Sequence, residues 1–133
     1  MNSNKQLGNS FEQDLCERLA ADGFWTHNFA QNQHGQPADV IAARNGQAHL
    51  IDCKVCTRKG FDLRRIEDNQ ELSMMRWSET GNGKGYFAIL LDEEIFMLDS
   101  YTALIMRQEL STLNTDLIRK WGIPLEAWVK KCE

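Results

Sequence analysis

The dipeptide Asn45-Gly46 constrains the fold of this chain more than any other two residues. It separates two strand-like runs, 38–44 and 47–55, which are rich in apolar side chains. Asn-Gly is the strongest signal for a two-residue hairpin loop, because a type I′ turn needs positive φ at both positions. The turn predicts an antiparallel pair of strands in which Arg44 faces Gln47.

If the same register continues away from the turn, each residue of the first strand pairs with one of the second, and Asp39 pairs with Asp52. Side chains directly opposite each other on an antiparallel pair lie about 5 Å apart, so two carboxylates in these positions repel each other. Mg²⁺ removes such repulsion, since it binds one or two carboxylates and also binds phosphate oxygens. Lys54 shares their face because strand side chains alternate, and its ammonium can hold a phosphate oxygen or help to orient and deprotonate an attacking water. These three residues predict a metal-dependent site for phosphodiester hydrolysis.

A plainer interpretation of residues 52–54 is an exposed strand edge with a cross-strand salt bridge, since Asp and Lys are common on strand surfaces. The flanking residues favour a buried sheet instead, because apolar side chains occupy both faces of the two runs. These side chains are Val40, Ile41, Leu50, Ile51 and Val55. Charges rarely occur in a buried sheet without a task, so the context favours the chemical interpretation.

The rest of the chain alternates between helical and strand-like patterns. Phe11, Leu15 and Leu19 recur at four-residue spacing, as on one face of a helix that Gly23 ends. Such alternation predicts one domain of the α/β or α+β class, with helices on the faces of a sheet. In the first half we expect a helix from residue 9 or 10 to 22, a strand over 24–29 and a loop over 31–36. After the hairpin we expect a helix from Ile66 to near Gly81, with Asp68 as a cap or first-turn acid, and strands over 86–91 and 95–98. The last part should contain a helix that Ser100 caps and that runs to about 110, a polar stretch over 111–115, and a helix that starts at Pro124.

Length and composition bound the class of protein. A chain of 133 residues with 42% hydrophobic content suffices for a single domain, residues 1–133. No run approaches the roughly 20 consecutive apolar residues of a membrane helix, and the first residues lack the apolar segment of a signal peptide. A cytoplasmic protein without a membrane partner is therefore expected. Its four cysteines suit neither a disulfide scaffold nor zinc, because Cys53-x-x-Cys56 has no second pair.

The net charge of −4 and the pI of 5.4 argue against a protein that coats nucleic acid indiscriminately. Positive charge is nevertheless concentrated after Lys54, in a segment that we call the basic strip. A local strip of this kind can hold phosphates while the rest of the surface stays acidic, so DNA contact is predicted there. The alternative is a solvated loop. The strip consists of Arg58, Lys59, Arg64 and Arg65.

Residues 36–39 (Gln-Pro-Ala-Asp), followed thirteen residues after the Asp by a segment 51–54 (Ile-Asp-Cys-Lys), resemble the signature of PD-(D/E)xK nucleases. Asp52 stands where Glu is commoner. The helix opening over 8–12 resembles that of the small Holliday-junction resolvases of this superfamily, whose first helix supplies a further acidic residue, matched here by Glu12. Gln70 matches a glutamine of the RecU-type resolvases, although their stalk-like insertion is not found here.

This resemblance implies a restriction-endonuclease-like fold, with a central mixed β-sheet flanked by helices. It also implies a metal-dependent endonuclease that acts on DNA, including branched DNA, usually as a homodimer. Mg²⁺ or Mn²⁺ would be bound by Asp39, Asp52 and Glu12, Lys54 and Gln70 would complete the catalytic set, and no organic cofactor is expected. Glu12 also suits the first turn of a helix, and Gln70 could simply be polar on a packed face. The acidic pI leaves one competing function, a non-catalytic nuclease-fold module that binds a protein or a nucleic acid.

Overall fold

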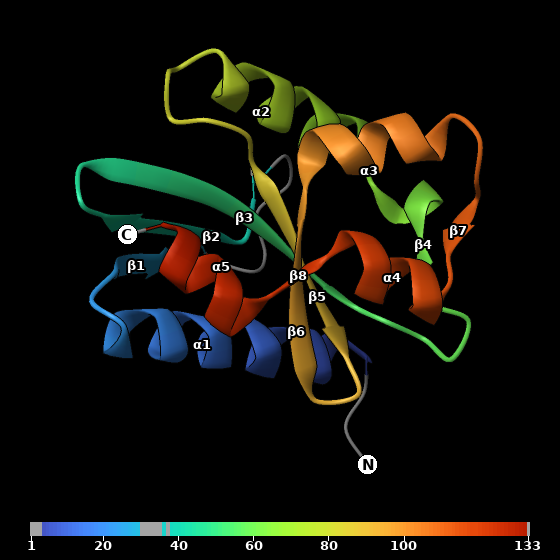
Figure 1. Cartoon of the computed structure of the whole chain (residues 1–133), viewed down its shortest axis with the longest axis horizontal. Coiled ribbons are helices and arrows are strands. Elements are labelled where there is room, and N and C mark those ends of the chain that lie inside the picture. The colour runs from blue at the N-terminus through green and yellow to red at the C-terminus, as the bar shows by residue number, and fades with distance from the viewer. Residues whose placement is uncertain (1–3, 30–35, 37, 133) are drawn as a thin grey trace.

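The structure is a computed structural model that describes residues 4–29, 36 and 38–132. Its centre is a six-stranded sheet in the order β1-β2-β3-β5-β6-β8, and a second sheet pairs β4 with β7 (Figure 1). Strands β3 and β5 run parallel, while the other neighbours are antiparallel. The strands are β1 (Trp25–Asn28), β2 (Val40–Arg44), β3 (Gln47–Val55), β4 (Phe61–Asp62), β5 (Tyr86–Leu91), β6 (Glu94–Asp99), β7 (Thr112–Leu113) and β8 (Ile123–Pro124).

Helices cover both faces of the central sheet, which confirms the predicted mixed sheet flanked by helices (Figure 1). On one face α1 (Asn4–Ala21) and α5 (Leu125–Lys131) contribute to a cluster around Trp128 and Leu15. On the other face α2 (Asp68–Ser78), α3 (Ser100–Arg107) and α4 (Thr115–Trp121) pack over Phe87 and Leu98. None of the described helices is long and apolar enough to cross a bilayer.

Strand β3 divides its side chains between the two clusters. Leu50 belongs to the cluster beneath α2, α3 and α4, whereas Ile51 belongs to the cluster beneath α1 and α5. Because side chains alternate along a strand, Asp52 and Lys54 lie on the α2 side of the sheet and Cys53 lies on the α1 side. The strand therefore carries two buried faces, as its apolar sequence predicts.

The predicted hairpin is present. Asn45 and Gly46 have positive φ angles of 55° and 78°, as a type I′ turn requires. The predicted register holds over β2, from the pair Arg44–Gln47 to the pair Val40–Ile51. Beyond Val40 it departs from the prediction, because the backbone N–H of Asp39 donates to the carbonyl of Ile51 at 3.1 Å. Asp39 is thus not a regular ladder partner of Asp52.

Several predicted boundaries shift for identifiable reasons. The first helix begins at Asn4 rather than at residue 9 or 10, because no proline separates those residues from the helix and Gly8 alone does not stop it. Asp99, not Ser100, caps α3, since its carboxylate accepts the N–H of Thr102 at 2.8 Å. This helix ends at Arg107, three residues earlier than expected. The second helix begins at Asp68, which is its first-turn acid as predicted, and Ile66 precedes it.

Short elements in the second half were not predicted. The 3-10 turn η1 (Leu63–Arg65) follows β4, and β4 pairs with β7 from a stretch that was expected to be a polar loop. Helix α4 fills the segment after it, and β8 adds to β6 immediately before α5. Such two-residue strands show no periodicity of their own. The predicted loop over 31–36 lies outside the described residues, except for Gln36.

Candidate active site

Asp52 is the most enclosed acidic side chain of the predicted site. It is 0% exposed in the middle of the sheet, and neither carboxylate oxygen has a well-aligned hydrogen-bond donor among the described residues. Burial, and then the neighbouring Asp39 carboxylate, raise the pKa of Asp52 well above its usual range, while Lys54 acts in the opposite direction. A carboxylate ionised in these surroundings needs a cation beside it.

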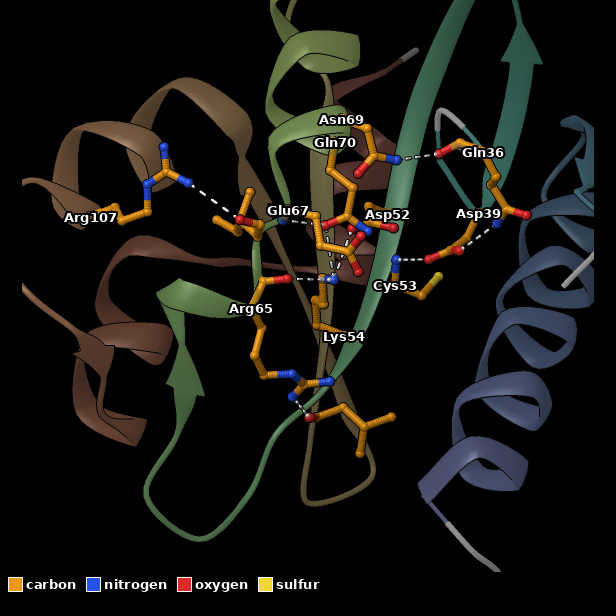
Figure 2. Close-up of polar contacts among 12 residues, drawn as sticks. Gln36, Asp39, Asp52, Cys53, Lys54, Arg65, Glu67, Asn69, Gln70 and Arg107 are labelled. Atoms are coloured by element: carbon orange, nitrogen blue, oxygen red, sulfur yellow. Dashed lines mark hydrogen bonds and ion pairs between the residues drawn. The ribbon is translucent and has the colours of Figure 1, made fainter. Parts of the chain in front are cut away.

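Lys54 is held in place by three oxygen atoms (Figure 2). Its Nζ lies 3.2 Å from Oδ2 of Asp52, and it donates to Oε1 of Gln70 at 3.2 Å and to the carbonyl of Arg65 at 3.5 Å. Oε1 of Gln70 also accepts the backbone N–H of Glu67 at 3.0 Å, so the first turn of α2 fixes this side chain. The ammonium therefore has a defined position beside the carboxylate.

Asp39 is bound to two separate parts of the site (Figure 2). Its Oδ2 accepts the backbone N–H of Cys53 at 2.7 Å, and its Oδ1 accepts Nε2 of Gln36 at 3.0 Å. Asn69, on α2, in turn donates to the carbonyl of Gln36 at 3.2 Å. Asp39 is therefore tied to β3 directly and to α2 through Gln36. These contacts, rather than the ladder register, bring it to Asp52.

Glu12 occupies a different place. It is 6% exposed on α1, next to Cys16 and Cys53. Burial and then nearby groups, Glu12 among them, raise the pKa of both thiols. Since Cys53 points to the α1 side of the sheet, Glu12 lies behind the strand that carries Asp52. The structure brings Asp39, Asp52, Lys54 and Gln70 together, and the role of Glu12 as a metal ligand stays a prediction.

The arrangement of donors fits a hard divalent cation. Among the described residues, no group of three or more His, Cys, Asp or Glu side chains is arranged to hold a metal ion. Mg²⁺ does not need such a group, because it usually binds one or two carboxylates and fills its other positions with water and substrate phosphate oxygens. The two oxygens of Asp52, which lack a well-aligned hydrogen-bond donor and lie beside Asp39, supply this kind of partial shell. The residues present therefore fit Mg²⁺ or Mn²⁺.

The cysteines do not form a competing metal or redox site. All four are free thiols, and burial raises the pKa of Cys56 to about 11. Burial raises the pKa of Cys53 as well, with smaller contributions from the surrounding carboxylates. Thiols with raised pKa values stay protonated at neutral pH, whereas metal ligands and nucleophiles are thiolates.

The basic strip is less uniform than its sequence suggests. Arg64 donates twice to the carboxylate of Asp62, at 3.0 Å from Nε and 3.0 Å from Nη2, so most of its charge is balanced locally. Arg65 donates to the carbonyl of Val55 at 3.0 Å and makes no ion pair with the described residues. Arg58 and Lys59 are exposed and make no ion pair with the described residues. Arg65 is the member whose backbone also contacts Lys54.

Residues that the sequence did not single out also contribute to the site. Gln36 and Asn69 link Asp39 to α2, and the backbone of Cys53 fixes Asp39. Gln36 belongs to the motif segment 36–39, so the sequence could have indicated that it lies at the site. Nothing in the sequence marked Asn69, because its contact depends on how α2 crosses the sheet.

Comparisons with known proteins identify the family of this chain. Residues 3–133 match the model of the archaeal Holliday junction resolvase (Hjc) family. The crossover junction endodeoxyribonuclease Hjc of Methanocaldococcus jannaschii is 30% identical over 94 residues, which span 71% of this chain and 66% of that relative's length. A solved structure of Hjc from Archaeoglobus fulgidus, a Holliday junction resolvase, superposes with a TM-score of 0.69 and 16% identity over 92% of this chain and 98% of that one, which shows the same fold. The family match covers nearly the whole sequence, and the chain belongs to the archaeal Holliday junction resolvase (Hjc) family.

Proposed function

We propose that this protein is a metal-dependent endonuclease that cleaves the phosphodiester bonds of branched DNA as a Holliday-junction resolvase. The observation that carries the proposal is the buried carboxylate of Asp52 beside a second carboxylate, Asp39, with only the Lys54 ammonium, at 3.2 Å, as an ion-pair partner among the described residues. Membership of the Hjc family supports the choice of substrate.

In this proposal Asp39 and Asp52 would hold Mg²⁺ or Mn²⁺, and the bound metal would supply stabilisation of negative charge on the phosphate and a lowered pKa for a bound water. Lys54 binds a phosphate oxygen or orients the water, because its Nζ is already directed to the carboxylate side by Gln70 and the carbonyl of Arg65. Gln70 is a positioning residue, since it contacts Lys54. The surrounding apolar sheet lowers the local dielectric constant and so strengthens each of these interactions.

DNA binding is assigned to the basic strip, with Arg65 first among its members. Its guanidinium is exposed and carries a full charge, and its backbone carbonyl touches the Lys54 ammonium. Arg58 and Lys59 would extend the contact with the phosphate backbone. Arg64 contributes less, because Asp62 already balances it.

The proposal includes a homodimer. A four-way junction is two-fold symmetric, and a two-fold dimer presents two sites in the matching arrangement. Large apolar side chains are exposed on neighbouring faces of α2 and α3, which lie side by side (Figure 1). Such a patch suits a contact between two copies of the chain. Its members are Leu72, Met75, Tyr101 and Ile105, each between 46% and 61% exposed.

The competing function, a non-catalytic module, requires a site that no longer binds metal. Two neighbouring buried carboxylates that share one lysine are costly for a protein that only uses its surface, so the geometry favours the enzyme.

The proposed function is tested with a four-way junction and a linear duplex of the same sequences, each incubated with the protein in Mg²⁺, Mn²⁺ or EDTA. We expect metal-dependent strand cleavage that is faster on the junction. Binding of the junction without cleavage in either metal would favour the non-catalytic module. Equal cleavage of the two substrates would retain the nuclease and remove the junction preference.

A further inference from the structure

Strand β1 forms one edge of the central sheet, and three aromatic side chains follow each other on one of its faces. Trp25 and His27 stack, with ring centroids 6.3 Å apart and planes 12° apart. His27 meets Phe29 edge to face at 5.2 Å. Trp25 is 64% exposed, which makes it the most exposed large apolar side chain among the described residues. We call these three residues the aromatic row.

The aromatic row lies on the active-site face of the sheet. His27 pairs with Ile41, which pairs with Leu50, and directly paired residues point to the same face. Leu50 and Ile41 pack in the cluster beneath α2, on the side of Asp52. The row is also adjacent to the site, because the backbone N–H of Phe29 donates to the carbonyl of Asp39 at 2.9 Å. It therefore runs outward from the carboxylates.

A cavity of about 350 Å³ opens beside the inner end of the aromatic row, between the sheet and α2. Phe29, Ile41 and Leu50 form its floor, and Trp77 and Arg76 line its α2 side. Nε1 of Trp77 is buried and donates to no acceptor among the described residues. Because this N–H is closed to solvent, an acceptor in the cavity does not reach it, and the positive charge that the cavity offers comes from Arg76.

We propose that the aromatic row and this cavity bind an unpaired nucleic-acid strand next to the cleavage site, with bases stacked on Trp25 and His27. The inference rests on the proposed nuclease function. Every base offers a flat face to an aromatic ring, so stacking of this kind is independent of sequence. Four residue steps of strand β1 extend about 13 Å. Stacked nucleotides advance about 3.4 Å each, so the row spans about three or four bases.

The surroundings favour nucleic acid over a protein as the occupant. The exposed groups of the row are aromatic rings rather than the aliphatic side chains of the α2–α3 patch, and the row begins at the site where the phosphate must bind. Arg76 adds a positive charge at the inner end. A protein strand added to the edge of β1 would use its backbone and would not require these side chains.

The test measures the affinity of labelled duplexes that carry a single-stranded extension, in Ca²⁺ to limit cleavage. One extension has normal nucleotides, and the other has abasic nucleotides. Trp25→Ala should weaken binding of the normal extension by about 5- to 100-fold, the range for loss of one base–aromatic stack. The abasic extension should weaken binding by wild type more than binding by Trp25→Ala, because the variant retains only the stack on His27. Trp25→Phe should restore most of the affinity.

Trp121→Ala is the matched control, since Trp121 is 49% exposed on α4, outside the row, and its loss should change neither affinity. Equal losses on the normal and abasic extensions, or no loss at all, would overturn the stacking role. So would a Trp25→Ala variant whose oligomeric state changes while its DNA affinity does not, because the row would then contact protein. If wild type cleaves the junction while Trp25→Ala binds normally, this inference alone fails. If wild type neither binds nor cleaves DNA, the proposed function fails with it.

Discussion

The two faces of β3 carry equally buried titratable groups, but in opposite surroundings. On the α1 side His49 is 4% exposed and packs edge to face against Trp128, with ring centroids 5.0 Å apart. On the α2 side Asp52 is fully buried, and its carboxylate oxygens have no well-aligned donor among the described residues. Nε2 of His49 also has no hydrogen-bond partner among the described residues, so the faces differ in what surrounds the group: aromatic rings enclose His49, whereas Asp52 lies between a second carboxylate, Asp39, and the Lys54 ammonium.

This difference separates stability from chemistry along a single strand. Trp128 also stacks on Phe24 and contacts Tyr86, so the α1 side is a packed core. The α2 side has a packed core as well, around Phe87 and Leu98, but there β3 also carries Asp52 and Lys54. We therefore expect substitutions in the α1-side core to lower stability with little effect on cleavage, and substitution of Asp52 to do the reverse.

The largest effect on stability is expected for Trp128→Ala. Removing a fully buried aromatic side chain leaves a cavity and should lower the free energy of unfolding by about 3–5 kcal/mol. Chemical denaturation measures this loss, and Trp128→Phe should lose less. Cleavage per folded molecule, measured below the melting temperature, should stay close to wild type. An unchanged denaturation midpoint would contradict the assignment of Trp128 to the packed core on the α1 side of the sheet.

Asp52→Asn should act in the opposite direction in EDTA. The folded protein holds the pKa of Asp52 above its ordinary value of 3.8, so the folded state binds the proton more tightly than the unfolded state does. Stability from this group is therefore present at low pH and is lost as pH rises through the raised pKa. The variant avoids this loss and should exceed wild type by up to about 1–3 kcal/mol at alkaline pH.

Thermal melting in EDTA across pH checks this prediction, since the gap between variant and wild type should widen as pH rises. Mg²⁺ provides the control: it should raise the melting temperature of wild type by mass action and leave Asp52→Asn unchanged. A variant that is less stable than wild type at every pH would contradict the account of Asp52.

A smaller effect is expected within the basic strip. Arg65→Ala should weaken junction binding and flatten the dependence of log affinity on log salt by about one unit, as for the loss of one phosphate contact. Arg64→Ala should change both less, because Asp62 already pairs with this guanidinium. Titrations at several salt concentrations compare the two variants. Equal effects of Arg64→Ala and Arg65→Ala would mean that the ion pair between Arg64 and Asp62 breaks when DNA binds.

The smallest effect concerns His49. Burial, with Arg44 nearby, lowers the pKa of His49 below its ordinary value of 6.5. The unfolded state then takes up the proton first, so wild-type stability falls as pH drops below about 6.5. His49→Gln should reduce this acid sensitivity, as melting between pH 5 and pH 8 can show. An unchanged acid response would place the sensitive group elsewhere.

The sequence predicted the elements that local rules control. The Asn45-Gly46 turn set the register of β2 and β3, and alternation placed Asp52 and Lys54 on one face. It did not predict how Asp39 reaches Asp52, because the slip in hydrogen bonding before Val40 depends on the Cys53 N–H and on Gln36.

The remaining misses depend on contacts between distant segments. The β4–β7 pair joins residues about fifty positions apart in the chain. Strands of two residues are too short to show a periodic sequence pattern, so the sequence could not predict this pair. The pairing of Arg64 with Asp62 is a different case, because the two residues are close in the chain: Asp62 was visible in the sequence as the acid within the basic run, but not which cation it pairs with. Gln70 was a match to a family pattern, and the structure shows its contact with Lys54.

Single-turnover cleavage of one four-way junction in Mg²⁺ tests the central claim most directly, with wild type, Asp52→Asn and His49→Gln compared at one temperature where all three are folded. These two substitutions remove buried groups from opposite faces of the same strand. We expect Asp52→Asn to lower the rate about a thousandfold or more, as loss of preorganised electrostatic stabilisation does, and His49→Gln to stay near the wild-type rate. Wild-type cleavage by Asp52→Asn, or an equal loss in His49→Gln, would contradict the assignment of catalysis to the α2 side of β3.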